Sequence, residues 1–238
     1  MRLDKLLAHT GYGTRKDVKE ILRKKRVSVD GKIMTKGNVQ VYPKEQIIMV
    51  DEKKIHYEKY AYLLLHKPKG YVSATVDKRD KTVIDLVPNQ YEHYDLAPVG
   101  RLDIDTEGLM LLTNDGMLNH ILTSPKNAIY KTYYAEVDGR VTEEHINQFK
   151  AGIVLDDGYQ TKSAELQIVK TDSVSEIKLS ICEGKFHQVK RMFQEIDMEV
   201  VYLKRLTIGK LSLDEELLLG SIRSLNKDEL AYVTSLKE

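Results

Sequence analysis

Four consecutive apolar residues, Leu109 to Leu112, lie between two segments that favour turns. Residues 100–108 (GRLDIDTEG) precede them and contain three acids and two glycines, while residues 113–116 (TNDG) follow. Short apolar runs bounded by turn signals are typical of buried strands. The pattern therefore predicts a strand over Leu109 to Thr113, fed by an irregular acidic loop. Such a loop is a common place for catalysis, although an acidic turn exposed to water has the same pattern.

The same loop has part of the spacing of a calcium-binding loop. Its three acids and Gly108 match positions 1, 3, 5 and 6 of that pattern. Position 12 is Asn114, however, where such loops need a bidentate Glu. Elsewhere, His187 has no second ligand at the fixed spacing of a zinc site. We therefore expect no metal site.

The distribution of charge is more informative than its sum. The 238 residues suit one large domain or two unequal ones, and 42% are hydrophobic, enough to bury a sizeable core. The net charge is only +1, but residues 2–26 contain nine Lys and Arg against three acids, which leaves −5 for the rest. A basic terminal unit on a mildly acidic body is typical of a nucleic-acid-binding protein. A solvated helix face has the same composition.

The basic segment has the pattern of two short helices followed by a hairpin. Apolar residues at 3, 6 and 7 predict the first helix, and Thr14 is suited to cap the second. Along that second helix Arg15, Lys19 and Arg23 recur every four residues, so they align on one face. Asp30 and the glycine after it, between short β-prone runs, predict a hairpin turn. The unit would then present a cationic ridge that can follow phosphates.

This N-terminal unit resembles the S4 RNA-binding domain. The match lies in residues 2–7 (RLDKLL), the Thr-Arg helix start at 14–15, and residues 26–31 (RVSVDG). The resemblance implies RNA binding through six basic residues: Arg2, Arg15, Lys16, Lys19, Arg23 and Arg26. A charged segment at 51–54 indicates a linker, and we expect an S4-like domain over residues 1–58 and a second domain over 59–238.

Beyond this linker the pattern alternates between strands and helices. We expect strands over residues 60–65, 131–137, 162–169, 174–182, 200–208 and 217–222, with residues 66–70 interrupting the first and residues 71–75 resuming an extended pattern. We expect helices over 82–87, from a cap at Asn114 or Asp115 through Leu122, over 141–149, and from Asn226. Three tyrosines near 130–134 are either core packing or a platform on which a base stacks.

Residues 183–193 (EGKFHQVKRMF) form the second informative stretch. After Gly184 a helix is predicted, with apolar residues at 189, 192, 193 and 196 on its core face. His187, Lys190, Arg191 and Gln194 have the same spacing on the opposite face. That face is either a solvated basic surface or a cluster of donors directed at a phosphate or a carboxylate.

Taken together, these stretches resemble the RNA pseudouridine synthases. Residues 100–109 are similar to the catalytic motif of that family, and residues 183–192 to a later motif of its RsuA branch. Residues 67–70 (KPKG) and 131–133 (KTY) match further landmarks, so the resemblance covers nearly the whole chain. It implies an α+β fold, with a small N-terminal S4-like domain and a larger pseudouridine synthase domain built on a mostly antiparallel mixed sheet.

The resemblance also implies roles for individual residues. Asp103 would be the essential catalytic carboxylate, Tyr133 would stack on the target uracil, and Lys190 would pair with Asp103. Arg101 would contact RNA beside the aspartate. Further substrate-binding residues would be Lys67, Lys185, His187 and Arg191.

The reaction implied is the isomerisation of uridine to pseudouridine, which needs no redox change and no group transfer, so no cofactor is expected. Asp103 could attack C1′ of the ribose or remove the C2′ proton, and the sequence leaves both open. The expected substrate is ribosomal RNA, most simply 16S small-subunit RNA or a small-subunit assembly intermediate. The alternatives are 23S large-subunit RNA, or a non-catalytic RNA-binding factor in ribosome assembly.

The remaining expectations concern the cellular setting. Cys182 is the single cysteine, so the chain has no internal disulfide, which fits a reducing cytosol. Residues 1–13 lack the apolar core of a signal peptide, and the longest apolar run, residues 60–65, is too short to cross a bilayer. We expect a cytoplasmic, monomeric protein of ribosome biogenesis with no membrane partner.

Overall fold

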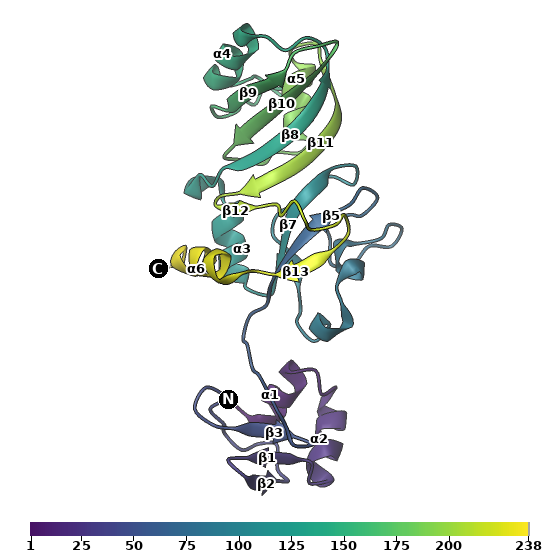
Figure 1. The fold of residues 1–238 in the computed structure, drawn as a ribbon, viewed down its shortest axis with the longest axis vertical. Helices are drawn as coiled ribbons and strands as arrows, with labels where there is room; N and C mark the ends of the chain where they lie inside the picture. The colour runs from purple at the N-terminus through teal and green to yellow at the C-terminus, as the bar shows by residue number, and fades with distance from the viewer. Residues whose placement is uncertain (238) are drawn as a thin grey trace. The chain divides into compact units, whose positions relative to one another are not determined.

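The computed structural model describes residues 1–237, which form two compact units (Figure 1). The first contains residues 1–61 together with residues 88–95, and the second contains residues 62–87 and the chain from Leu96 onward. The return of residues 88–95 to the first unit was not indicated by the sequence pattern. Within that unit, the Tyr94 hydroxyl donates to the carbonyl oxygen of Glu58 at 3.3 Å.

The N-terminal unit packs two helices against a small antiparallel sheet. Its helices are α1 (Leu3–His9) and α2 (Arg15–Arg23), and the sheet order is β2-β1-β3-β4, formed by Lys32–Met34, Val27–Val29, Ile48–Val50 and Lys53–Lys54. The predicted cap is confirmed, because the Thr14 side chain accepts from the Asp17 amide and the Asp17 carboxylate accepts from the Thr14 amide. The predicted hairpin is also confirmed: Asp30 and Gly31 both adopt positive φ, as a tight hairpin turn requires.

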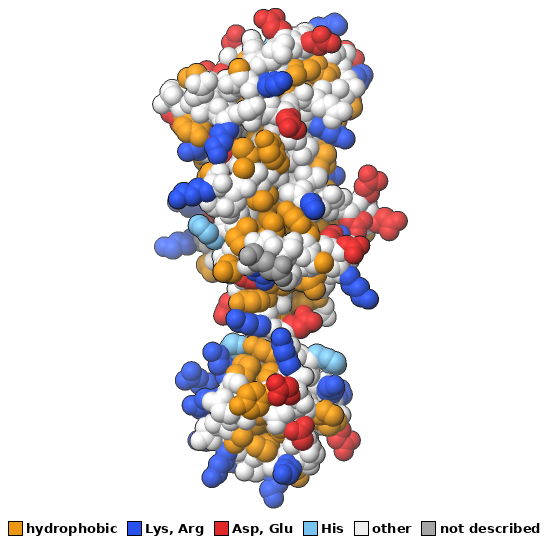
Figure 2. All heavy atoms as spheres, turned by 90° about the vertical axis from the view of Figure 1, so that its left-hand side faces the viewer, with side chains coloured by type: hydrophobic (Ala, Val, Ile, Leu, Met, Phe, Trp, Pro, Cys, Tyr) orange, Lys and Arg blue, Asp and Glu red, His pale blue; other side chains and the backbone are white. Residues whose placement is uncertain are grey.

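The apolar stripes of both helices meet the sheet in one core, which leaves the basic side chains outside. Leu3, Leu6 and Leu7 are fully buried, whereas the basic residues of α2 are exposed. Figure 2 shows this unit from the side away from α2, and Lys and Arg side chains lie around its edges in that view as well. The helix therefore presents the cationic ridge that its spacing predicts.

The second unit is built on one large mixed sheet with strand order β13-β5-β7-β11-β8-β10-β9, to which β6 and β12 add short edges. The strands are β5 (Tyr62–Lys67), β6 (Ala97–Pro98), β7 (Glu107–Thr113), β8 (Lys131–Asp138), β9 (Glu165–Lys170), β10 (Val174–Ile181), β11 (Glu199–Ile208), β12 (Leu211–Ser212) and β13 (Ile222–Ser224). Among the paired strands of the described chain, only β7 and β11 run parallel, and all the other pairs are antiparallel. The predicted α+β class with a mostly antiparallel mixed sheet is confirmed.

Four α-helices of the described chain cover this sheet: α3 (Gly116–Thr123), α4 (Glu143–Ala151), α5 (Gln188–Gln194) and α6 (Lys227–Ser235). Three short 3₁₀ helices, Val83–Leu86, Asn89–Tyr91 and Pro125–Asn127, connect other elements. Helices α4 and α5 bury Phe149 and Phe193 against β8 and β10, while α3 and α6 share a second core with β5 and β7. No helix among the described residues is both long and apolar enough to span a membrane.

Three predicted boundaries are corrected. Strand β5 continues through His66 and Lys67, which pair with Leu109 and Gly108 of β7, and it ends at Pro68, which has no amide hydrogen to continue the ladder. Residues 71–75 form no strand and make only an isolated bridge from Val72 to Thr82. Strand β13 begins at Ile222, where the prediction for 217–222 ended.

Gly108 makes the single parallel pairing possible. Its φ is +110°, and a Cβ at this position would lie 2.2 Å from the backbone oxygen of Arg205 on β11. Only glycine lets the two backbones approach this closely. The acidic loop therefore enters the sheet beside β11 and opposite the end of β5.

Candidate active site

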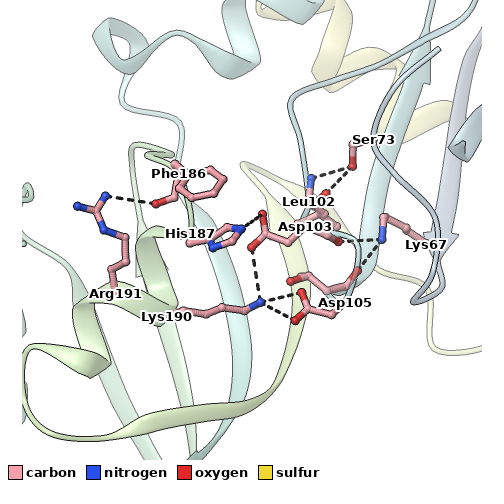
Figure 3. A network of polar contacts seen from close by, with 10 residues as sticks. Lys67, Ser73, Leu102, Asp103, Asp105, Phe186, His187, Lys190 and Arg191 are labelled. Atoms are coloured by element: carbon pink, nitrogen blue, oxygen red, sulfur yellow. Dashed lines mark hydrogen bonds and ion pairs between the residues drawn. The ribbon is translucent and has the colours of Figure 1, made fainter. Parts of the chain in front are cut away.

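The buried ammonium of Lys67 fixes the acidic loop from beneath. Its Nζ donates to the carbonyl oxygens of Pro68, Asp103 and Thr106 at 3.1, 3.0 and 2.8 Å (Figure 3). Burial lowers the pKa of Lys67 to about 8, against the opposing effect of the nearby Asp103 and Asp105 carboxylates. Lys67 was predicted to bind substrate, but the residue is 0% exposed, because β5 continues through it and places its ammonium against the loop backbone.

Residues 70–73 form hydrogen bonds to the backbone of the loop and stabilise it on its other side. The Ser73 hydroxyl donates to the Leu102 carbonyl at 2.7 Å and accepts from the Leu102 amide at 2.9 Å. The Gly70 amide donates to the Ile104 carbonyl at 2.7 Å. The residues on either side of Asp103 are thus fixed, and its carboxylate has a defined position.

The Asp103 carboxylate lies between two basic side chains of the second motif. His187 Nε2 is 3.6 Å from Asp103 Oδ1, and Lys190 Nζ is 3.8 Å from Asp103 Oδ2. The Asp103 side chain is 26% exposed and Lys190 is 21% exposed, so water reaches both only in part. Asp103 and Lys190 therefore lie close together, as predicted, although they are far apart in the sequence.

Asp105 is a second partner of Lys190 that the sequence reasoning missed. Lys190 Nζ lies 2.7 Å from both Asp105 oxygens, closer than to Asp103. Burial alone would raise the pKa of Asp105, but the hydrogen bond and charge of Lys190 outweigh it and leave this pKa below its ordinary value. The sequence signal for this second contact was the position of Asp105, only two residues after Asp103 in the same loop. Lys190 therefore bridges two carboxylates.

A cavity of about 340 Å³ opens beside this cluster, and Asp103, His187 and Lys190 lie at its wall. Tyr133 lines it from β8 and is half-buried against the core, while the exposed Arg101 lines it from the loop. The cavity therefore brings together the three predicted catalytic residues Asp103, Tyr133 and Lys190. Two further basic residues line it that the sequence reasoning did not assign, Lys131 and Arg205.

The segment before α5 is fixed by a buried network that was also missed. The Glu183 carboxylate accepts from the Tyr159 hydroxyl at 2.7 Å, from the Lys162 amide at 2.9 Å and from the Gln188 amide group at 2.8 Å. Gln188 in turn accepts from the Lys185 amide at 2.8 Å. This network positions the start of α5, from which Lys190 projects toward the aspartates.

The other predicted residues of this segment have different environments. His187 caps α5 with φ +48° and stacks on the exposed Phe186, with ring centroids 3.8 Å apart. Lys185 is exposed at the cavity rim and lies over the Tyr159 ring, 4.1 Å from its centroid. Both are placed where they could contact a substrate.

Arg191, which was predicted to bind substrate, lies away from the cavity. Its guanidinium forms ion pairs with Asp156 and Asp157 and is directed away from Asp103 (Figure 3). It is not among the residues that line the cavity. The successive side chains of a helix point in different directions, so Lys190 and Arg191 diverge.

The predicted RNA-binding residues of the N-terminal unit are exposed, and two of them have acidic partners. Arg2 pairs with Asp4, and Arg26 pairs with Asp51 through two of its three guanidinium nitrogens, Nε and Nη2. Among the residues that the structure describes, the side chains of Arg15, Lys19 and Arg23 on α2 form no hydrogen bond or ion pair. Among all described residues, no cluster of three or more His, Cys, Asp or Glu could hold a metal ion.

The sheet, the S4-like unit and the aspartate–lysine cluster at a cavity are the features of one enzyme class. The family model described as RNA pseudouridylate synthase matches residues 61–195, and the S4 domain model matches residues 1–47. The chain therefore belongs to the RNA pseudouridylate synthase family, whose members are isomerases. The predicted family, the S4 domain and the enzyme class are confirmed.

Individual relatives narrow the comparison. The chain is 44% identical to YtzG, an RNA pseudouridine synthase of Bacillus subtilis, over 231 residues and 97% of both chains. It is 36% identical to ribosomal small subunit pseudouridine synthase A of Yersinia pestis, over 98% of both chains. It is 38% identical to ribosomal large subunit pseudouridine synthase B of Bacillus subtilis, over 100% of this chain and 97% of that one. A crystal structure described as pseudouridylate synthase superposes with a TM-score of 0.68 and 34% identity, covering 98% of this chain and 99% of the other.

Proposed function

We propose that this enzyme converts one uridine of 16S ribosomal RNA to pseudouridine, with Asp103 as the catalytic carboxylate. The observation that carries the assignment is the position of Asp103, at the wall of a cavity and 3.8 Å from the Lys190 ammonium. The chemistry requires a negative carboxylate, and the Lys190 ammonium lies where it can offset that charge. The side chains of Lys67 and Ser73 donate to backbone carbonyls of the loop and fix it, so the carboxylate needs little rearrangement when RNA binds.

The reaction begins with cleavage of the bond between uracil N1 and ribose C1′. Asp103 either attacks C1′ or removes the C2′ proton, and both routes use an ionised carboxylate beside the sugar. The detached base then turns, and its C5 bonds to C1′. Lys190 counters the charge of Asp103, while Asp105 shares Lys190 and orients its ammonium.

Tyr133 receives the target base. Its half-buried position on β8 puts the ring in the cavity, where an extruded uracil can stack on it. Taking a base out of its stack costs a few kcal/mol, which stacking and phosphate contacts offset. Arg101, Lys185 and His187 at the cavity are placed to contact the RNA around that base.

The N-terminal unit would deliver the RNA. The exposed α2 residues Arg15, Lys16, Lys19 and Arg23, with Arg2 and Arg26, form a positive surface suited to phosphates. The enzyme would act as a cytoplasmic monomer on ribosomal RNA or on a small-subunit assembly intermediate.

A specific observation favours a second substrate. The chain is 38% identical to a relative named for the large subunit and 36% identical to one named for the small subunit, both over nearly full length. This near equality makes 23S ribosomal RNA the competing substrate. The chemistry at Asp103 would be the same in both cases.

The test is to map pseudouridine in 16S and 23S ribosomal RNA from cells that lack the gene and from the same cells complemented with the wild-type enzyme. We expect one pseudouridine of 16S RNA to disappear and to return on complementation. Loss of a site in 23S RNA instead would overturn the choice of subunit. If no pseudouridine of either RNA depends on the gene, ribosomal RNA is not the substrate.

A further inference from the structure

Two basic side chains lie deep in the cavity and have no role in the proposal above. Lys131 is 8% exposed on β8, and Arg205 is 3% exposed on β11. In the β8–β11 pairing Arg205 lies directly opposite Tyr133, and Lys131 is two residues before Tyr133 on the same face. The two cations therefore flank the ring on which the base is proposed to stack.

These cations are incompletely paired within the described part of the chain. Arg205 Nε donates to the Leu109 carbonyl at 2.8 Å, but its buried Nη2 has no hydrogen-bond partner. The structure gives Lys131 Nζ no hydrogen bond or ion pair with a described residue. Burial, followed by repulsion from Arg205, lowers the pKa of Lys131 to about 8.

The carboxylates that line the same cavity are engaged elsewhere. Asp103 lies beside His187 and Lys190, and Glu183 accepts three hydrogen bonds from the segment before α5 and its surroundings. A buried cation without a partner is costly, and two adjacent ones repel each other. The site therefore calls for a ligand that brings negative charge or strong acceptors.

The shape of the site favours a base over a phosphate. Ile181, Leu203 and Ile208 line the cavity with Lys131 and Arg205, and all three are buried. An apolar wall suits the faces and edges of a flat ring, whereas a phosphodiester group carries its charge on the outer side of the RNA chain. A uracil stacked on Tyr133 would bring its carbonyl oxygens toward the two cations.

We propose that Lys131 and Arg205 bind the carbonyl oxygens O2 and O4 of the target uracil and stabilise the charge that develops on the base when it detaches. The proposal rests on the function proposed above. Cleavage of the N1–C1′ bond leaves the bonding electron pair on N1, and the negative charge is shared with O2 and O4. C5 then forms its bond to C1′, C5 loses its proton and N1 gains one, so the product is an isomer with no net change. Both routes open to Asp103 pass through this detached base.

The experiment compares Lys131→Met with wild-type enzyme in single-turnover reactions on two RNAs that differ only at the target, uridine or 5-fluorouridine. The quantity measured is the rate at which the N1-linked nucleoside is lost, followed by nuclease digestion and mass spectrometry. Fluorine withdraws electrons and stabilises the charge on the base by itself, so the fluorinated substrate should depend less on Lys131.

We expect Lys131→Met to slow the reaction of the uridine substrate about 100-fold. The reaction of the fluorinated substrate should slow by about tenfold or less. RNA affinity should remain within about threefold, because the contact forms mainly in the transition state. The conservative Lys131→Arg should restore most of the rate. The matched control is Lys178→Met, which removes an exposed lysine of the neighbouring strand β10 and should leave both rates unchanged.

Equal slowing of both substrates would overturn the proposal, as would an unchanged rate. Weakened RNA binding at an unchanged rate would also overturn the proposal and would show that Lys131 binds an RNA phosphate. Should Lys131→Met fail to fold by circular dichroism, the rates of Lys131→Arg and Lys131→Gln on the two substrates decide the question. Failure of the wild-type enzyme to convert the uridine substrate would instead refute the proposed function.

Discussion

Lys190 shows how single side chains set the chemistry of this site. Its ammonium lies closer to Asp105 than to Asp103, so one cation serves two carboxylates. We expect Lys190→Met to lower the single-turnover rate of pseudouridine formation about 100-fold, because the negative charge of Asp103 loses its counterpart. The matched Asp105→Asn should lower the same rate less than about tenfold, since the Lys190 ammonium remains and can move toward Asp103. Equal losses in the two variants would contradict this division of roles.

Asp115 predicts how stability depends on pH. Its buried carboxylate caps α3 and accepts from the Tyr62 hydroxyl at 2.7 Å and from Lys237 Nζ at 2.9 Å. Burial would raise the pKa of Asp115, but these hydrogen bonds outweigh it and leave the pKa below its ordinary value. The unfolded chain therefore binds the proton first on acidification. The stabilising contribution of Asp115 is fully present above the pKa of this group in the unfolded chain, about 4. It is lost as the pH falls through the lower pKa of Asp115 in the folded protein.

Urea unfolding of wild type and Asp115→Asn between pH 7 and pH 3 tests this sign. We expect the variant to be less stable at pH 7 by about 1–3 kcal/mol, with the gap narrowing as the pH falls. A gap that stays constant or widens toward pH 3 would show that the folded-state pKa of Asp115 is not depressed.

At the same scale, the sequence motifs were sufficient to select Asp103, Tyr133 and Lys190 but not to separate exposed from buried lysines. Lys67 was assigned to substrate because residues 67–70 match a landmark of the family. Lys67 is buried because β5 pairs with β7 as far as Gly108, a contact between segments that are far apart in the sequence. The pairing of Arg191 with Asp156 and Asp157 is equally non-local.

At the scale of elements, the junction of β7 with β11 decides where the acidic loop enters the sheet. We expect Gly108→Ala to destabilise the protein by at least about 3 kcal/mol, because the new Cβ meets the Arg205 backbone in a conformation that alanine avoids. The control is Gly116→Ala at the start of α3, where an added Cβ meets nothing within 4 Å. It should be neutral or slightly stabilising in the same urea titration. A tolerated Gly108→Ala would show that the two backbones can separate.

Periodicity predicted most elements of the second unit, including the β7 strand and the caps of α3 and α6. It failed where neighbours decide the outcome. Residues 71–75 have a strand-like pattern, yet they form no sheet ladder, and the Ser73 side chain bonds to the backbone of the acidic loop. The parallel pairing of β7 with β11 depends on backbone proximity, for which Gly108 was the only local sign.

At the scale of the whole molecule, the charge asymmetry assigns RNA affinity to the N-terminal unit and chemistry to the second unit. We expect the triple variant Arg15→Ala, Lys19→Ala and Arg23→Ala to reduce the slope of log affinity against log salt by about 2. The rate at saturating RNA should change little. The matched control replaces three exposed lysines of the second unit by alanine, Lys150, Lys178 and Lys227. A full salt slope in the α2 variant, or a lost slope in the control, would contradict the assignment.

The two-unit organisation was readable from the charge distribution. The linker predicted at residues 51–54 is wrong, because these residues form a turn and strand β4 of the first unit's sheet. The return of residues 88–95 to the first unit was not indicated by the sequence. That return depends on contacts such as the one from Tyr94 to Glu58, between segments whose local patterns are unremarkable loops. The boundary after residue 58 stays a prediction.

The most direct measurement of the central claim is pseudouridine formation by purified Asp103→Asn on the target RNA under single-turnover conditions. The substitution keeps the size of the side chain and removes only its charge and basicity. We expect RNA affinity within about threefold of wild type and a rate at least about 1,000-fold lower. An Asp103→Asn enzyme that forms pseudouridine at a rate near that of wild type would show that this carboxylate does not carry the reaction.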